Sequence, residues 1–144
     1  MIGKDENRPI VGNISDIDSK TEYNETPVFL AAQNGNLKLL KELIEDGNAD
    51  FKNIETKWNI ETTPLHVAAN KGHLKVAEYL VEKCPKCVLR KNRFLYTPES
   101  VAKQYCKNTN SKYCPTIVFS VREEIGIQYC KNTSSDNCPT STTL

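Results

Sequence analysis

Two blocks of the sequence repeat one another without a gap. Residues 26–40 read TPVFLAAQNGNLKLL, and residues 63–77 read TPLHVAANKGHLKVA. A third, weaker start lies at Thr97-Pro98, so the three starts are 37 and 34 residues apart. A period close to this is typical of stacked helical hairpins, in which each unit buries its apolar face against its neighbours. This repetition constrains the fold more than any other feature of the chain.

Each block has the pattern of two short antiparallel helices. The opening Thr is a good N-cap, and the Pro after it suits the first helical position, where no N–H is needed. Gly35 and Gly72 are placed to end the first helix in the left-handed conformation. Apolar residues then recur at helical spacing over 37–44 and 74–81, with Lys and Glu on the opposite face. We therefore expect a helix pair in each unit.

The connectors before the units are short and polar, and they suit extended fingers with a tight turn. Large aromatic residues stand in or near them: Tyr23, Trp58 and Phe94. An exposed aromatic residue at a tip is typical of a binding hot spot, whereas the alternative is packing onto the next unit. Both alternatives stay open for Trp58, and we expect packing for Phe94.

The C-terminal third contains a different repeat. Residues 104–116 read QYCKNTNSKYCPT and recur as QYCKNTSSDNCPT at 128–140, with a period of 24, which a segment duplication explains most simply. Between the copies we expect a closing helix over about 115–130. Residues 131–144 are rich in Ser, Thr and Asn without an apolar period, so we expect a disordered tail or the start of a truncated further unit. The array would span 14–130, after a flexible segment over 1–13.

These motifs resemble those of ankyrin-repeat proteins. Residues 63–73 match the core motif of that family in full, whereas the first block has Phe29 where the family prefers His. The third unit keeps only Thr97, Pro98 and Ala102. The resemblance implies an all-α solenoid of stacked helix-turn-helix units with hairpin finger loops. It also implies a concave face, made by fingers and first helices, that binds other proteins.

The resemblance assigns structural roles to the repeated residues. In the family, the His of the motif hydrogen-bonds the motif Thr and neighbouring backbone groups, and so ties adjacent units together; here it is His66. We expect His73 to fix the turn between two helices. The motif residues are Thr26, Pro27, Gly35, Thr63, Pro64, His66, Gly72, Thr97 and Pro98.

The favoured function is a protein–protein interaction module without catalysis. Stacking would hold the binding side chains in place before the partner arrives, so that little ordering entropy opposes binding. We expect the chain to be monomeric and its partner to be another protein. The predicted partner-binding residues are Tyr23, Lys57, Trp58, Asn59 and Arg93 in the fingers, and Gln33, Asn34, Asn70, Lys71 and Lys103 on the first helices.

Other classes of function have little support. There is no phosphate loop, dinucleotide fingerprint, nucleophile elbow or zinc-protease motif, and no carboxylate pair stands out, so we expect no enzyme activity and no cofactor. Lys and Arg number 19 against 18 acidic residues, which argues against a strongly basic nucleic-acid binder. The basic run Lys86, Arg90, Lys91 and Arg93 suits a solvated finger. No apolar run approaches eighteen residues, so membrane insertion is not expected.

Six cysteines stand at positions 84, 87, 106, 114, 130 and 138. The N-terminus shows no secretory signal, so we expect an intracellular, cytoplasmic location and free thiols. Abundant Asn, Lys and Ile hint at an AT-rich genome such as that of a parasite, a symbiont or a large virus. Delivery into a host cell is therefore the alternative location.

The cysteines also provide the alternative function. Cys84 and Cys87, three positions apart, have a spacing that can bind Zn²⁺ or form a redox pair, and Cys106 and Cys114 would have to complete a zinc site. The alternative is therefore a zinc-binding or thiol-redox-responsive switch on an ankyrin platform. Disulfides within 106–114 and 130–138 would each close an eight-residue loop.

Overall fold

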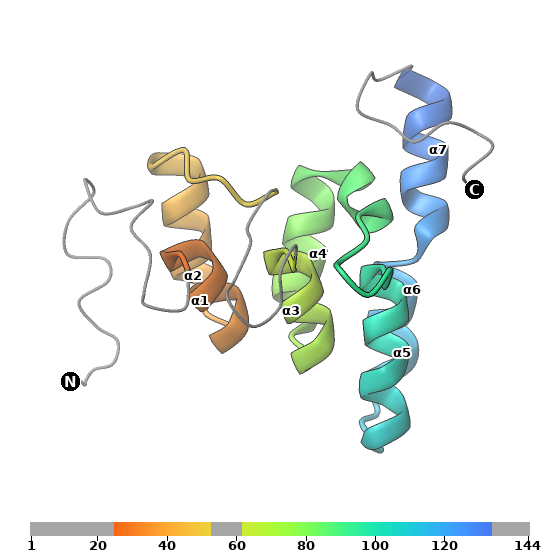
Figure 1. Cartoon of the computed structure of the whole chain (residues 1–144). Coiled ribbons are helices and arrows are strands. Elements are labelled where there is room, and N and C mark those ends of the chain that lie inside the picture. The colour runs from red at the N-terminus through yellow and green to blue at the C-terminus, as the bar shows by residue number, and fades with distance from the viewer. Residues whose placement is uncertain (1–24, 53–61, 134–144) are drawn as a thin grey trace.

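The structure is a computed structural model that describes residues 25–52 and 62–133 (Figure 1). These residues form helices and their connections, with no strand among them. The helices in chain order are α1 (Pro27–Asn34), α2 (Leu37–Lys41), the π-helix η3 (Glu42–Asp46), α3 (Pro64–Lys71), α4 (Leu74–Lys83), the 3₁₀-helix η4 (Pro85–Leu89), α5 (Pro98–Asn108), α6 (Cys114–Ser120) and α7 (Glu123–Thr133).

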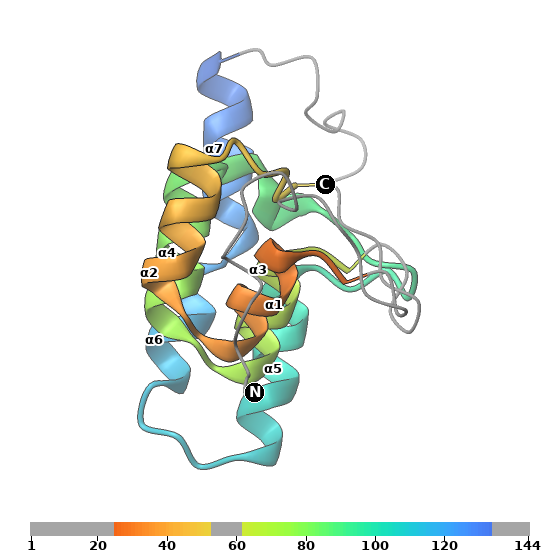
Figure 2. The same cartoon turned by 90° about the vertical axis from the view of Figure 1, so that its left-hand side faces the viewer.

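The helices stack side by side in two layers. The inner layer is α1, α3 and α5, in which each helix packs on the next, and the outer layer is α2 with η3, α4 and α6. Figure 2 shows the two layers edge on, with the connector between η4 and α5 projecting away from the outer layer. The all-α solenoid that the repeats predict is confirmed.

The apolar core lies between these layers. Each helix contributes its small and apolar residues, and the Ala pairs of α1 and α3 are almost fully buried, which lets the inner helices pack closely. The largest fully buried apolar side chains are Leu40, Leu80, Ile117, Val28, Val76, Val88 and Val121. Because these come from all three units, the core is continuous along the stack.

The three inner helices begin in the same way. The hydroxyl oxygens of Thr26, Thr63 and Thr97 accept hydrogen bonds from the backbone N–H three residues later, at 3.2, 3.3 and 3.3 Å. A Pro follows each Thr at the start of the helix. The N-caps that the sequence predicts are therefore all formed.

Gly35 and Gly72 end α1 and α3 with φ of 72° and 76°, a left-handed conformation that favours glycine. Both also lie against the next unit. A Cβ added to Gly35 would be 2.7 Å from Nδ1 of His73, and one added to Gly72 would be 2.5 Å from Cζ of Tyr105. The glycines are thus needed for close stacking as well as for the turn.

The outer layer has its own contact between units. The hydroxyl of Tyr79 on α4 donates to Oε2 of Glu45 in η3, at 2.6 Å. Burial raises the pKa of Tyr79, and the hydrogen bond from Tyr79 lowers the pKa of Glu45. Lys83 lies 3.7 Å from the same carboxylate. These contacts join the first unit to the second on the side away from the fingers.

The third unit departs from the other two. Cys106 occupies the position of Gly35 and Gly72, and α5 continues past it to Asn108, so it has 11 residues where α1 and α3 each have 8. Cys106 forms a disulfide with Cys114 at the start of α6. The disulfide closes a helical hairpin that lacks the glycine turn.

The expected closing helix over 115–130 is two helices, α6 and α7, that are separated at Val121 and Arg122. Neither Pro nor Gly causes this break. The backbone N–H of Glu123 donates to Oε1 of Glu99, and the hydroxyl of Thr97 donates to Oε2 of Glu123. Contacts with the start of α5 therefore hold the first residue of α7.

The third connector also differs from the extended finger that we expected, because it begins with η4. This short helix is where α7 packs: a Cβ on Gly126 would lie 2.7 Å from Cγ of Leu89 and 2.9 Å from Cγ2 of Val88. Residues 131–133, which we expected in a tail, are the end of α7. The N-terminal segment 1–13 and residues 134–144 lie outside the described residues.

Replacing Gly72 with Ala should destabilise the stack by about 1–3 kcal/mol, because the left-handed φ and the Tyr105 ring both oppose a Cβ. Chemical denaturation of the two proteins measures this. Gly47, with φ of −104°, is the matched control, and Gly47→Ala should change the free energy of unfolding by less than about 0.5 kcal/mol. Equal effects of the two substitutions would contradict the assigned role of Gly72.

Candidate functional site

A groove of about 420 Å³ runs across the inner layer and beneath the third finger. All three inner helices and the connector 92–96 contribute to it, so it exists only because the units are stacked. The described residues that line it are Glu25, Phe29, Gln33, Thr62, His66, Val67, Asn70, Lys71, Asn92, Phe94, Tyr96, Val101 and Gln104.

Amide side chains repeat along the floor of the groove. Gln33, Asn70 and Gln104 each stand seven residues after the N-cap Thr of their unit, and all three line the groove. Within the described chain, none of these side-chain amides makes a hydrogen bond. Val67 and Val101 likewise hold equivalent positions one turn earlier. The stack therefore places amide donors and acceptors in a row.

The third finger forms one wall of the groove and is a hydrogen-bonded turn. The Asn92 side-chain oxygen accepts from the N–H groups of Phe94 and Tyr96, at 2.9 and 3.0 Å. The backbone N–H of Asn92 donates to the Tyr96 carbonyl at 2.9 Å, and Leu95 has a φ of 68°. Buried Asn92 thus fixes the loop from inside.

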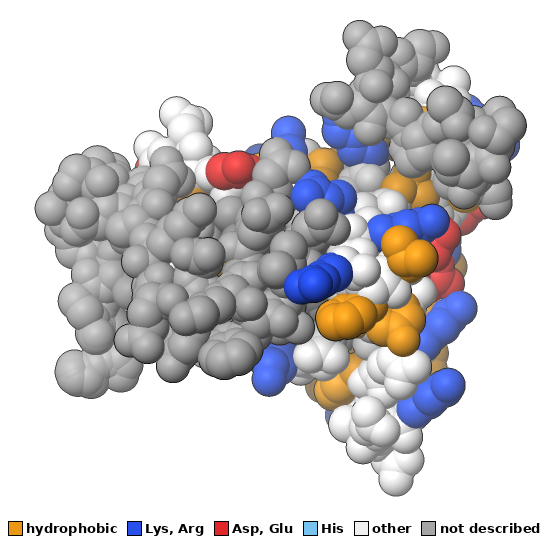
Figure 3. Space-filling model, in the orientation of Figure 1, with side chains coloured by type: hydrophobic (Ala, Val, Ile, Leu, Met, Phe, Trp, Pro, Cys, Tyr) orange, Lys and Arg blue, Asp and Glu red, His pale blue; other side chains and the backbone are white. Residues whose placement is uncertain are grey.

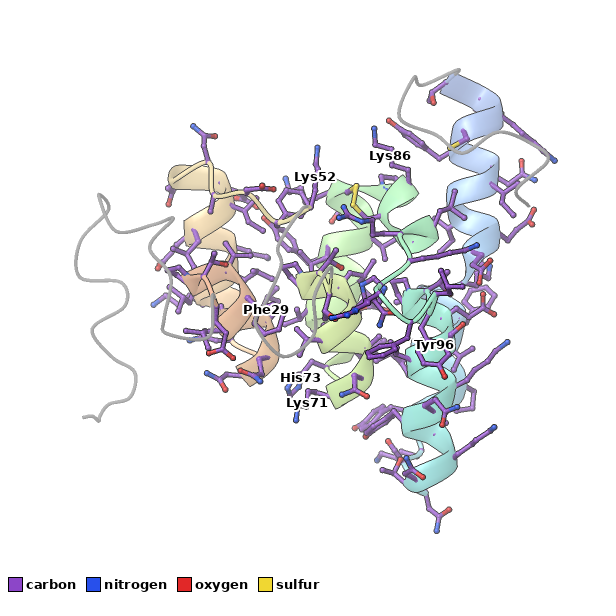
Figure 4. All side chains as sticks on the ribbon, in the orientation of Figure 1. Phe29, Lys52, Lys71, His73, Lys86 and Tyr96 are labelled. Carbon is purple, nitrogen blue, oxygen red and sulfur yellow. A yellow bond between two sulfur atoms is a disulfide. The ribbon has the colours of Figure 1, made fainter. Side chains whose placement is uncertain are left out.

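This turn exposes the side chains at its tip. Phe94 is 61% exposed and Leu95 is 73% exposed. The expectation that Phe94 packs onto the next unit was wrong, because the turn around Asn92 directs its side chain to the rim of the groove. Figure 4 shows Tyr96 near α5 and Phe29 on α1, with α3 between them. Aromatic residues therefore lie at both ends of the groove.

His66 joins this finger to the second unit. Its Nε2 lies 2.9 Å from the Tyr96 carbonyl oxygen, and its Nδ1 lies 2.8 Å from the Thr63 hydroxyl. The Thr63 N–H donates to Nδ1, so the ring proton is on Nε2, which donates to Tyr96. Burial lowers the pKa of His66 to about 4, against the opposing effect of the Tyr96 carbonyl. The role that the resemblance assigned to this His is confirmed.

His73 has a different role from the one that we expected. It does not cap the turn of its own unit, since its side chain makes no capping hydrogen bond. Its Nε2 lies 2.9 Å from the backbone carbonyl oxygen of Gln33, and its ring packs on Gly35. His73 therefore fastens the second unit to the end of α1. The two histidines of the chain together join three consecutive units.

Among the described residues, the charges near the groove are mainly positive. Lys71 lines it, and exposed Lys91 and Arg93 lie beside the exposed tip of the finger. Figure 3 shows basic side chains around the apolar ones on the described part of this face. Glu25, at the α1 end, is the one acidic residue among the described residues that line the groove. The end of the groove that is formed by α3 and the third finger is thus its basic end.

The structure places the predicted partner-binding residues unevenly. Gln33, Asn70 and Lys71 line the groove. Asn34, Arg93 and Lys103 are exposed near it without lining it, and Lys103 pairs with Glu99 at 3.2 Å. The other four predictions lie outside the described residues: Tyr23, Lys57, Trp58 and Asn59.

Several groove residues were missed by the sequence reasoning. Gln104 could have been found by its register, since it matches Gln33 and Asn70 when the units are aligned on their Thr. Phe29 could have been found in the same way, as the counterpart of His66. No sequence signal identified Asn92 or Tyr96, which reach the groove through the geometry of the turn.

The cysteines within the described part of the chain are paired, in contrast to the free thiols that we expected. Cys84 bonds to Cys87, Cys106 bonds to Cys114, and Cys130 is also disulfide-bonded. The first pair joins the end of α4 to η4, whereas the second lies at the far end of α5. The structure therefore does not assemble the four-cysteine zinc site, and no group of three metal-binding side chains occurs among the described residues.

A family model for ankyrin repeats (three copies) matches residues 6–92. The chain therefore belongs to the ankyrin-repeat family, whose members are generally protein–protein interaction modules and are typically non-catalytic. The matched region ends before α5, so the hairpin of α5 and α6 is recognised as a further unit by its packing. No curated protein matches the chain. Among the described helices, none has the length and apolar character to cross a membrane.

The low pKa of His66 predicts that the protein loses stability in mild acid. In the unfolded chain His66 has its ordinary pKa of 6.5, whereas in the folded protein its pKa is about 4. Between these values the unfolded chain holds more protons, so the free energy of unfolding falls as the pH falls. The expected loss between pH 7 and 5 is about 2 kcal/mol.

Denaturation curves at pH 7 and 5 measure this dependence. His66→Gln keeps an N–H that can face Tyr96 but does not titrate, so it should lose less stability on acidification. His73→Gln is the matched control and should keep the acid sensitivity that His66 causes. An identical pH dependence in wild type and His66→Gln would contradict the assignment.

Proposed function

We propose that the chain is a non-catalytic binding module that holds a partner protein in the groove over α1, α3 and α5. The observation that carries the proposal is the third finger, in which buried Asn92 and His66 fix a loop whose apolar tip stays exposed. Exposed apolar side chains on a fixed loop bind at a low entropic cost. The chain would act as a monomer.

The groove supports this proposal more than the outer layer does. Its floor carries amides without hydrogen bonds in the described chain, and its rim carries Phe94 and Leu95. Such a mixture of a few apolar anchors with polar surroundings is typical of protein interfaces. Phe119 is also exposed, but Arg122 covers its ring at 3.7 Å, so it is less available as an anchor.

Substituting the finger tip should weaken partner capture without unfolding the protein. Phe94 and Leu95 are mostly exposed, so Phe94→Ala with Leu95→Ala removes apolar contact area but little of the core. The loss of two anchors should weaken binding by about tenfold or more. Affinity capture from extracts of the source cells, followed by quantitative mass spectrometry, compares the wild type and the variant.

Phe119→Ala is the matched control because it also removes an exposed aromatic ring, on α6. Partners that bind through the groove should be retained by this control and lost by the finger variant. Circular dichroism should show the same helix content in all three proteins. If the finger variant retains every partner that the wild type retains, the proposed binding face is wrong.

The disulfides favour a second candidate function, a thiol-responsive switch. Cys84–Cys87 ties η4 to the end of α4, and η4 carries Leu89 and Val88 against Gly126 of α7. A dithiol reductant would convert the disulfide into two thiols and would itself be oxidised to a disulfide. The freed η4 would then hold α7 less firmly.

Reduction should therefore loosen α7 more than α1. The loop constraint of a small disulfide is worth about 2 kcal/mol, so amides of η4 and α7 should exchange hydrogen up to about thirtyfold faster after dithiothreitol treatment. Cys84→Ser with Cys87→Ser should reproduce this effect, while Cys106→Ser with Cys114→Ser should act on the α5–α6 hairpin. Unchanged exchange in α7 for the first double variant would exclude the switch.

A further inference from the structure

The groove also indicates the kind of segment that it binds. We infer that it takes a left-handed extended (polyproline II) segment of the partner protein, with acidic side chains close to a proline or another apolar residue. This inference rests on the proposed function and specifies its partner. Three independent features support it: the spacing of the amides, the aromatic wall and the charge.

The first feature is the match between two periods. Gln33, Asn70 and Gln104 stand on neighbouring inner helices at the same position of each unit. Packed helices lie about 8–10 Å apart, so the amides recur at about that distance. A polyproline II segment rises 3.1 Å per residue with about three residues per turn, so every third residue faces the same side at intervals of about 9 Å.

The amides also have the chemistry that such a segment needs. A polyproline II backbone makes no internal hydrogen bonds, so its N–H and C=O groups are open to a binding surface. Each side-chain amide offers a donor and an acceptor, and can therefore bond either group. The three floor amides make no hydrogen bonds within the described chain, so binding would not break existing ones. An α-helix or a paired strand would offer its backbone groups already bonded.

The second feature is the aromatic wall. Phe94 and Tyr96 line the groove beside Val101, and Tyr96 is 46% exposed. Aromatic-lined grooves bind proline-rich segments because the rigid pyrrolidine rings pack on flat side chains and little backbone entropy is lost. The hydrogen bonds of Asn92 and His66 hold this wall in place before binding. We therefore place a proline or another apolar residue between Phe94 and Tyr96.

The third feature is charge. Lys71 on the floor and exposed Lys91 and Arg93 on the finger make the α3–finger end of the groove basic. Lys103 on α5 adds a further exposed amine, although it pairs with Glu99. Glu25 marks the α1 end, away from these cations. Acidic residues of the segment would thus lie over α3 and the finger, and the affinity should fall as salt is added.

Selection from a displayed library of random twelve-residue peptides tests this inference on the full chain. The expected result is enrichment of peptides that combine Asp or Glu with Pro, with recurrence at a spacing of three residues. The most enriched peptide, made synthetically with a fluorescent label, then serves as the probe for the affinity measurements. Its circular dichroism should show polyproline II character before binding.

Substitutions in the groove distinguish hydrogen bonding by the row of amides from non-specific binding. Removing one neutral hydrogen bond should weaken the probe about three- to tenfold, so Asn70→Ala should do this and Asn70→Gln should restore part of the loss. Gln128→Ala is the matched control, since Gln128 is an exposed amide on α7 outside the groove, and it should leave the affinity unchanged. Lys71→Glu should weaken the probe further than Lys71→Ala.

Several results would overturn the inference. These are a library that yields no binder, enrichment of basic or helical peptides, or a probe whose affinity is the same for Asn70→Ala and Gln128→Ala. The proposed function fails separately, when partner capture does not depend on the finger tip. If partner capture needs Phe94 and Leu95 but no acidic extended peptide binds, this inference is wrong and the proposed function stands. The groove would then bind a folded domain.

Discussion

The contact of His66 with the Tyr96 carbonyl is the interaction on which the proposed binding face depends. The same ring receives the N–H of Thr63 at the start of α3, so one buried side chain satisfies a helix start and a finger from the following unit. These groups are 30 residues apart in the chain, and without the ring the Tyr96 carbonyl would lose this partner. The contact that stacks the second and third units therefore also shapes the proposed binding face.

Stacking explains why short helices suffice here. α1 and α3 have 8 residues each, and isolated helices of that length are not stable in water. Their stability comes from the shared core and from small residues that let the units approach, with Gly35 against His73 and Gly72 against Tyr105. The third unit has no glycine at this position, and a disulfide between Cys106 and Cys114 holds its two helices instead.

The first two units could be predicted from the sequence because their signals are local. Thr-Pro caps a helix and Gly ends it through backbone geometry alone, so α1 and α3 begin and end where the motif places them. The break at Val121 carries no such signal, because it depends on Glu99 and Thr97 holding Glu123. Likewise, the exposure of Phe94 depends on the turn around Asn92. The general preference for burying aromatic residues therefore led to a wrong prediction for Phe94.

The disulfides show a different limit of sequence reasoning. The spacing of the cysteines was compatible with free thiols, zinc or bridges, and the expected compartment decided between them. The fold instead favours disulfides. The end of α4 brings Cys84 to Cys87, and the end of α5 brings Cys106 to Cys114. The row of Gln33, Asn70 and Gln104 was within reach of the sequence, since aligning the units on their Thr residues shows it.

Amide hydrogen exchange of the third finger tests whether the proposed binding loop is fixed before any partner arrives. The N–H groups of Asn92, Leu95, Phe94 and Tyr96 all donate within the turn. These amides should exchange slowly in the free protein, and His66→Ala should make them exchange fast while the amides of α1 stay protected. Fast exchange of these amides in the wild-type protein would contradict a loop fixed in advance.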